Sequence, residues 1–136
     1  MTKRVLLVLI LGVAVAAVYF GIQEWNRGLA QADDVKADVV ISATELFTAY
    51  TSDETAANGR FNDKAVQVTG LVREVGGVAG GPVNLMLETG DPLGAVVCEF
   101  APGTVLEVKK DAQATVKGFC AGYNLDVLLQ RCAIVE

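Results

Sequence analysis

The chain carries three cysteines and no histidine among its 136 residues. Cys98, Cys120 and Cys132 are separated by 22 and 12 residues, and none belongs to a CxxC motif. A redox-active dithiol and a zinc site usually use thiols at closer, characteristic spacings, so neither is indicated. Outside the cytoplasm such thiols tend to pair. We therefore expect one disulfide and one core thiol, and the alternative is three reduced thiols. A disulfide that involves Cys132 is favoured, because the last strand of an OB barrel, which carries Cys132, neighbours both the third and the fourth strand.

The missing histidine excludes Ser–His and Cys–His catalysis and histidine-bound zinc within this chain. Adjacent acids at Asp33-Asp34 and Asp53-Glu54 lie in a predicted linker and a helix cap, where solvation and capping account for them. The glycine-rich stretches lack the Lys-Ser or Lys-Thr that follows a phosphate loop. Haem carriage by an anchored chaperone would also need a histidine. We expect no enzyme, no metal site and no cofactor.

The acidic charge disfavours a protein that holds nucleic acid by neutralising its phosphates. The formal net charge of the whole chain is −5. From Asp33 onward the chain has 15 acidic and 8 basic residues, a net charge of −7. Hydrophobic residues make up 52% of the chain, and many of them lie in one run near the N-terminus.

That run extends from Val5 to Ile22 without a charge and follows Lys3-Arg4. As a helix it would be about 27 Å long, close to the thickness of a bilayer core. The positive-inside rule predicts a single-pass anchor with the C-terminal domain outside the cytoplasm, which for a protein of a bacterial inner membrane is the periplasm. Cleavage after Ala30-Gln31-Ala32 is the alternative. No cysteine lies near the end of the run, so a lipid-modified N-terminus is not indicated.

The remaining sequence divides into a linker and a domain. We assign residues 1–22 to the anchor or uncleaved signal, 23–41 to a stalk, and 42–136 to the domain. Ser42 and Glu45 form a predicted capping box at the start of a helix. Asp53 is expected to cap a second short helix that ends at Asn58-Gly59.

From Lys64 the apolar residues alternate with polar ones, which predicts β-strands. Gly70 suggests a bulge or bend. Residues 104–110 are expected to form a short helical connector, and residues 121–124 a hairpin loop. In the last strand, Val127 and Leu129 share a face with Cys132 and Ile134 only if a residue is bulged between them. Five strands in this order predict a mainly β, five-stranded OB-fold barrel with leading helices.

Residues Ser42 to Val135 resemble the tRNA-anticodon-like OB-fold family of bacterial membrane and exported proteins. The resemblance implies an OB barrel and a binding role without a defined ligand. It rests on a leading helix with Leu46 and Tyr50 and on these segments: Ala57 to Lys64, Val66-Gln67-Val68-Thr69-Gly70, Val97-Cys98-Glu99-Phe100, Val116-Lys117-Gly118-Phe119-Cys120 and Asp126 to Cys132.

Ligands of OB folds lie over the second and third strands, between two hairpin loops. The outward residues expected there include no aromatic and no basic side chain, which argues against nucleic acid as a partner. We instead expect a membrane-anchored binding module for an envelope protein or small ligand. The alternative is an OB-type binder of single-stranded nucleic acid or oligosaccharide. The candidate ligand residues are Arg73, Gly76, Gly77, Gly80, Gly81, Tyr123 and Asn124.

Overall fold

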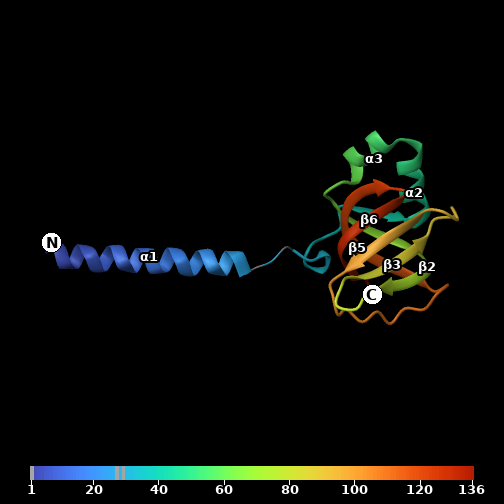
Figure 1. The fold of residues 1–136 in the computed structure, drawn as a ribbon. Coiled ribbons are helices and arrows are strands. Elements are labelled where there is room, and N and C mark those ends of the chain that lie inside the picture. The colour runs from blue at the N-terminus through green and yellow to red at the C-terminus, as the bar shows by residue number, and fades with distance from the viewer. Residues whose placement is uncertain (1, 27, 29) are drawn as a thin grey trace.

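In a computed structural model of the chain, an apolar helix precedes a mostly β domain (Figure 1). The structure describes residues 2–26, 28 and 30–136. Two positions of the predicted stalk, 27 and 29, lie outside the described residues. Helix α1 (Lys3–Asn26) is, in the described part of the chain, the one helix long and apolar enough to cross a membrane. An 18-residue window within Lys3–Trp25 has a mean hydropathy of 2.8 and no buried residue, properties that a signal sequence shares.

Five strands form a closed barrel, in agreement with the prediction from sequence. In spatial order the neighbours are β2, β3, β4, β6 and β5, and β5 pairs back onto β2. The β4–β6 pair is parallel and the other barrel pairs are antiparallel. This is the strand order of an OB-type barrel. The strands are β2 (Ala65–Gly77), β3 (Val83–Glu88), β4 (Ala95–Phe100), β5 (Gln113–Asn124) and β6 (Asp126–Ile134).

Alternate residues of these strands fill the barrel, as the period of two predicts. Gly118 on β5 is buried beside Cys132 on β6, where a Cβ at position 118 would overlap the sulfur. The bulge expected in β6 is present at Arg131, whose φ is 53°. The core includes the fully buried residues Val66, Val68, Val72, Leu85, Leu87, Val96, Cys98, Val116, Val127 and Leu129.

The bulge in β2 lies at Arg73 and not at Gly70, where a bulge or a bend was expected. Gly70 stays in register opposite Ala114, and the pairing with β3 shifts between Val72 and Glu74. A Cβ at position 70 would lie 2.9 Å from the Cβ of Ala43. The glycine therefore allows the start of α2 to approach the barrel closely.

Helices α2 (Ala43–Ser52) and α3 (Glu54–Phe61) cover one end of the barrel (Figure 1). The capping box is confirmed, because the Glu45 N–H donates to Ser42 Oγ at 3.2 Å and the Ser42 N–H donates to Glu45 Oε2 at 3.1 Å. The Ser42 hydroxyl also donates to Glu45 Oε2 at 2.7 Å, and this bond, together with the one from the Ser42 N–H, lowers the pKa of the Glu45 carboxyl. Asp53 caps α3 as expected. The expected end of that helix at Asn58-Gly59 is wrong, since α3 continues to Phe61, whose side chain is fully buried.

Part of the predicted stalk packs on the barrel. Ala32, in the short 3₁₀ helix η1 (Ala32–Asp34), is fully buried. Strand β1 (Val39–Ser42) pairs in parallel with β2 and adds a strand that the sequence did not predict. Asp38 secures the junction, because its Oδ2 accepts from the Ala65 N–H at 3.0 Å. The chain is therefore held against the barrel soon after α1.

The expected helical connector at residues 104–110 is wrong, since this segment contains no helix. Leu106 and Val108 pack against the core, whereas Val105 is 84% exposed. The inward residues are two positions apart, which is the spacing of extended backbone and not of a helix.

The predicted hairpin loop at residues 121–124 is also wrong. Strand β5 stays paired with β6 up to Asn124, which lies opposite Asp126. A shift in register between Cys120 and Gly122 keeps the two strands together. Leu125 alone makes the turn, with a φ of 65°, and its side chain is 74% exposed.

Candidate binding site

A hollow of about 390 Å³ lies beside the β5–β6 hairpin. We call it the Tyr123 hollow. It combines an aromatic ring, an amide, a carboxylate, three aliphatic side chains and one glycine. Its lining residues are Val97, Ala121, Gly122, Tyr123, Asn124, Asp126 and Leu128.

The ring of Tyr123 is held by aromatic neighbours from α2. It stacks on Tyr50, with ring centroids 5.8 Å apart and an interplanar angle of 21°. Phe47 meets it edge-on at 6.0 Å. On its other side Tyr50 packs against Phe61 at 5.9 Å. Tyr123 is therefore a fixed wall of the hollow, and much of its ring surface is committed to these contacts.

A hydrogen-bond network holds Tyr50 in place behind this wall. The Tyr50 hydroxyl donates to Asn62 Oδ1 at 2.6 Å and lies 3.2 Å from Cys120 Sγ. The Asn62 amide donates in turn to Asn58 Oδ1 at 2.9 Å. Burial raises the pKa of Tyr50, so the hydroxyl keeps its proton. The network joins α2, α3 and β5 next to the hollow.

Asp126 has a structural role at the edge of the hollow. Its Oδ1 accepts from the Ala95 N–H at 2.8 Å, which ties the hairpin to the start of β4. Asp126 and Leu128 were not among the predicted site residues. Both residues follow Tyr123 closely in the sequence, just after a tight turn, and this proximity could have predicted that they line the same site.

Arg73, a predicted ligand residue, lies in a different hollow and is paired with an acid. Its Nη2 contacts Glu88 Oε2 at 2.7 Å and donates to the Asp91 carbonyl oxygen at 2.8 Å. The hydrogen bond to Glu88 raises the pKa of Arg73, and the charges of Asp126 and Asp91 add to the effect. The same contact lowers the pKa of Glu88. This cation is therefore surrounded by carboxylates.

The predicted glycine residues do not join Tyr123 and Asn124. Gly76 and Gly77 belong to β2 and pair with Asn84 and Val83 of β3. Gly80 and Gly81 lie in the turn of that hairpin, where a φ of 76° at Gly80 suits glycine. None of the four lines the Tyr123 hollow. Of the predicted ligand residues, only Tyr123 and Asn124 line this hollow, and the four glycines lie together in the β2–β3 hairpin.

The expected disulfide is wrong, because Cys98, Cys120 and Cys132 are all free thiols. In the strand pairing, Cys98 and Cys120 each lie opposite Leu129 of β6, and Leu129 is three residues before Cys132. No two cysteines are therefore direct partners across neighbouring strands. A hydrogen bond with Cys132, together with complete burial, raises the pKa of the Cys98 thiol. Burial also raises the pKa of Cys120. Buried protonated thiols of this kind are poor nucleophiles and metal ligands.

Among the described residues, no group of three Cys, Asp or Glu side chains could hold a metal ion. The outward side chains of β3 and β4 are only partly exposed and include two acids. They are Asn84, Met86, Glu88, Val97 and Glu99.

Comparison with known proteins agrees with the barrel. One of eight matching chains of solved structures is a proposed nucleic acid-binding lipoprotein from Klebsiella pneumoniae subsp. pneumoniae. It is 16% identical, with a TM-score of 0.58, and the alignment covers 71% of this chain and 91% of that chain. At this identity the likeness shows the fold alone. A comparison with curated proteins gives no match. The sequence matches the tRNA_anti-like family over residues 1–134, so the chain belongs to that family.

Proposed function

We propose that this protein is a membrane-anchored, periplasmic binding module whose Tyr123 hollow takes an uncharged or basic segment of an envelope protein or peptide. It would bind without catalysing a reaction and without a cofactor. The observation that carries the proposal is the composition of the hollow, which has an aromatic wall, an amide and a carboxylate but no cation in its described lining.

The electrostatics around the hollow support this choice of ligand. The neighbouring cation, Arg73, is paired with Glu88, and its pKa is affected by the charges of Asp91 and Asp126. The charge of Lys110 also acts on Glu88, so two positive charges meet three carboxylates, which still leaves a local excess of negative charge. A nucleic-acid backbone needs cations along its path, whereas a lysine or arginine side chain would be attracted to such a site.

The rigidity of the aromatic wall supports binding as well. Phe47 and Tyr50 fix the Tyr123 ring before any ligand arrives. A wall that is already ordered costs little conformational entropy on binding. Val97 and Leu128 offer apolar surface beside it, and Asn124 is exposed and offers both a donor and an acceptor.

Single-stranded nucleic acid is the second candidate. It is favoured by the likeness to the Klebsiella pneumoniae protein, which is itself a proposed nucleic acid-binding lipoprotein. An aromatic ring at the β5–β6 hairpin could also stack on a base. The acidic surroundings of Arg73 are the main observation against this candidate.

Binding can be tested with the full chain in lipid nanodiscs at physiological salt. We expect a capped Lys-Leu-Lys peptide to bind weakly and to shift the amide NMR signals of Tyr123 and Asn124. Asp126→Asn removes the charge but keeps an oxygen that can accept from the Ala95 N–H. We expect it to weaken peptide binding about two- to fivefold, because a partly exposed ion pair contributes up to about 1 kcal/mol.

Glu107→Gln serves as the matched control, since this carboxylate is exposed in the loop between β4 and β5. It should leave peptide binding unchanged. A ten-nucleotide oligothymidylate is the competing probe. If it binds more tightly than the peptide, loses affinity steeply with added salt and shifts the same signals, the nucleic-acid candidate is correct and the proposal fails.

The topology needs a separate test, because an apolar helix of this kind is equally compatible with a signal sequence. We expect alkaline phosphatase fused after Glu136 to be active in intact cells and to sediment with the inner membrane. The physical reason is the pair Lys3-Arg4 before the apolar run, which favours a cytoplasmic N-terminus. An inactive fusion would contradict export, and an active but soluble fusion would indicate cleavage.

A further inference from the structure

A second hollow, of about 330 Å³, lies where the chain from α1 first reaches the barrel. We call it the linker hollow. Gln31 contributes to it from the segment after α1, and Arg131 contributes from the bulge in β6. Glu99 and Phe100 at the end of β4, and Pro82 and Pro102 in the adjoining loops, complete the part of the wall that matters here.

Arg131 is held in one orientation at this hollow. Its guanidinium lies over the Phe119 ring, 4.2 Å from the centroid, and its Nη1 donates to the Ala30 carbonyl oxygen at 2.9 Å. An arginine carries five N–H donors, so this contact leaves most of them available. No ion pair involving Arg131 is found among residues 30–136. The group is therefore a fixed cation with unused donors.

The hollow is close to the end of the apolar helix along the chain. Helix α1 ends at Asn26, and Ala32 is fully buried against the barrel. The intervening residues 27–31 span at most about 20 Å even when extended. A further hydrogen bond, from Lys117 Nζ to the Val35 carbonyl oxygen at 2.6 Å, holds the segment that follows. If α1 spans the membrane, the linker hollow must stay near its surface.

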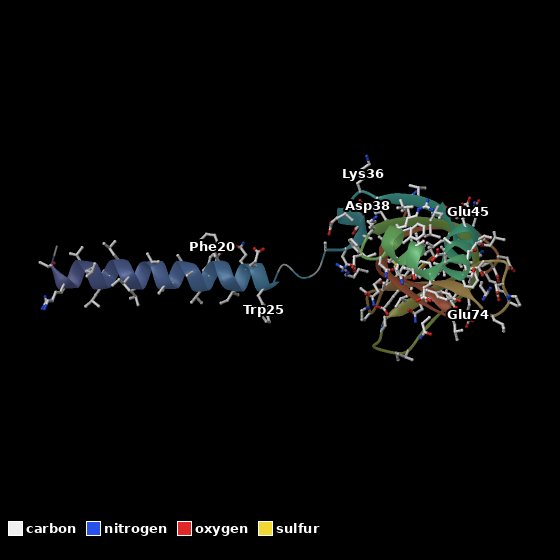
Figure 2. The ribbon with its side chains drawn as sticks, turned by 90° about the horizontal axis from the view of Figure 1, so that it is seen from above. Phe20, Trp25, Lys36, Asp38, Glu45 and Glu74 are labelled. Carbon is white, nitrogen blue, oxygen red and sulfur yellow. The ribbon has the colours of Figure 1, made fainter. Side chains whose placement is uncertain are left out.

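Figure 2 shows Lys36 and Asp38 on the part of the domain that adjoins the segment from α1. Both signs of charge occur around this segment, because Asp33 and Asp34 are exposed on η1. In the hollow itself, Arg131 and Glu99 also carry opposite charges without forming a salt bridge to each other in the described chain. A ligand with a net negative charge would be repelled by these carboxylates, whereas a ligand with one charge of each sign could place its anion at Arg131 and its cation toward Glu99.

We propose that the linker hollow binds the headgroup of a zwitterionic membrane phospholipid. The phosphate receives hydrogen bonds from Arg131, whose planar fork suits phosphate oxygens. The ammonium group lies toward Glu99. Pro82, Phe100 and Pro102 provide apolar surface for the glycerol and the first carbons of the chains. The proposal rests on the membrane anchoring proposed above, and its effect would be to set the orientation of the barrel on the bilayer.

The test uses the full chain in a maltoside detergent, with bound lipids counted by native mass spectrometry. The probes are dihexanoylphosphatidylethanolamine, dihexanoylphosphatidylglycerol and inorganic phosphate. We expect saturable binding of the phosphatidylethanolamine, about tenfold weakened by Arg131→Gln, because hydrogen bonds to a charged group are lost. Arg131→Lys should retain part of the affinity, since it keeps the charge but not the fork.

Glu99→Gln gives an independent readout that does not depend on Arg131. It should reduce the preference for phosphatidylethanolamine over phosphatidylglycerol, since it removes the partner of the ammonium. Lys109→Gln, a loss of one exposed charge in the loop between β4 and β5, should change nothing. If Arg131→Gln fails to fold, the Glu99→Gln ratio decides the matter. An unchanged ratio overturns the proposal.

Two other results would also overturn it: wild-type affinity in a folded Arg131→Gln chain, or displacement of the lipid by inorganic phosphate at similar concentrations. The second would assign the hollow to free phosphate. Asp126→Asn should leave lipid binding unchanged, so a failure here is distinguishable from a failure at the Tyr123 hollow. Failure of the membrane anchor itself would appear in the phosphatase fusion and not in this detergent measurement.

Discussion

Replacing Gly118 by alanine is expected to lower the free energy of unfolding by about 1–3 kcal/mol, the usual cost of overpacking a core. The added Cβ would overlap Cys132 Sγ and would lie 3.1 Å from Leu129 Cβ and 3.3 Å from the Gln130 carbonyl oxygen. The last two atoms belong to the paired strand β6 and cannot turn away. Urea unfolding of the full chain in detergent, followed by the near-UV circular dichroism of the tyrosines, measures the change.

Two further variants make this result specific. Cys132→Ala removes the overlapping sulfur. The double variant Gly118→Ala/Cys132→Ala should therefore be about 1 kcal/mol more stable than the sum of the two single-variant losses in unfolding free energy predicts. Gly59→Ala is the matched control, because a Cβ there meets nothing within 4 Å in helix α3. It should raise stability by about 0.5–1 kcal/mol. If Gly118→Ala is as stable as the natural chain, the packing described for β5 and β6 is wrong.

The barrel could be predicted because each strand carries its own signal. Alternation of apolar and polar residues places Leu85, Cys98 and Val116 inside, and all three are buried. The capping box at Ser42 is also local, since its partner Glu45 is three residues away. The bulge in β6 followed from the same alternation, because Val127 and Cys132 cannot share a face without it.

The parts that could not be predicted depend on contacts between residues distant in the sequence. Ala32 is buried because η1 packs on β5 and β6, and Arg131 donates to Ala30 across 101 positions. No local sequence pattern near residue 30 predicts these contacts with β5 and β6. The segment at residues 104–110 is extended because Leu106 and Val108 reach the core, a choice that its short pattern of valines leaves open.

The candidate site was predictable to the extent that it lies in one hairpin. Tyr123 and Asn124 were expected there and do line the hollow, whereas Arg73 does not. The bulge in β2 and the acids Glu88 and Asp91 determine where Arg73 lies. These acids come from a neighbouring strand and its following loop. The sequence could therefore suggest that loop residues form the site, but not which of them lie together in the folded chain.

The second large effect is expected for Tyr50, which supports the Tyr123 hollow from behind. Tyr50→Ala should lower the free energy of unfolding by about 3–5 kcal/mol, as losses of buried aromatic rings do. The variant removes the ring packed between Phe61 and Tyr123 and the donor to Asn62 Oδ1. Thermal unfolding of the full chain in detergent measures the loss, and Tyr19→Ala in α1, whose ring is 65% exposed, is the control that should leave the barrel unchanged.

Tyr50→Phe separates the hydroxyl from the ring. It removes the hydroxyl donor to Asn62 Oδ1, which keeps only the longer contact from Cys120 Sγ at 3.9 Å, and it keeps the ring in place, so the expected loss is about 1–3 kcal/mol. Because the stack on Tyr123 survives, this variant should keep the peptide affinity of the Tyr123 hollow, whereas Tyr50→Ala should weaken it even below its unfolding temperature. Equal losses of stability in the two variants, or equal losses of peptide affinity, would show that the ring does not order Tyr123. The aromatic wall would then have to be fixed by Phe47 and the strand backbone alone.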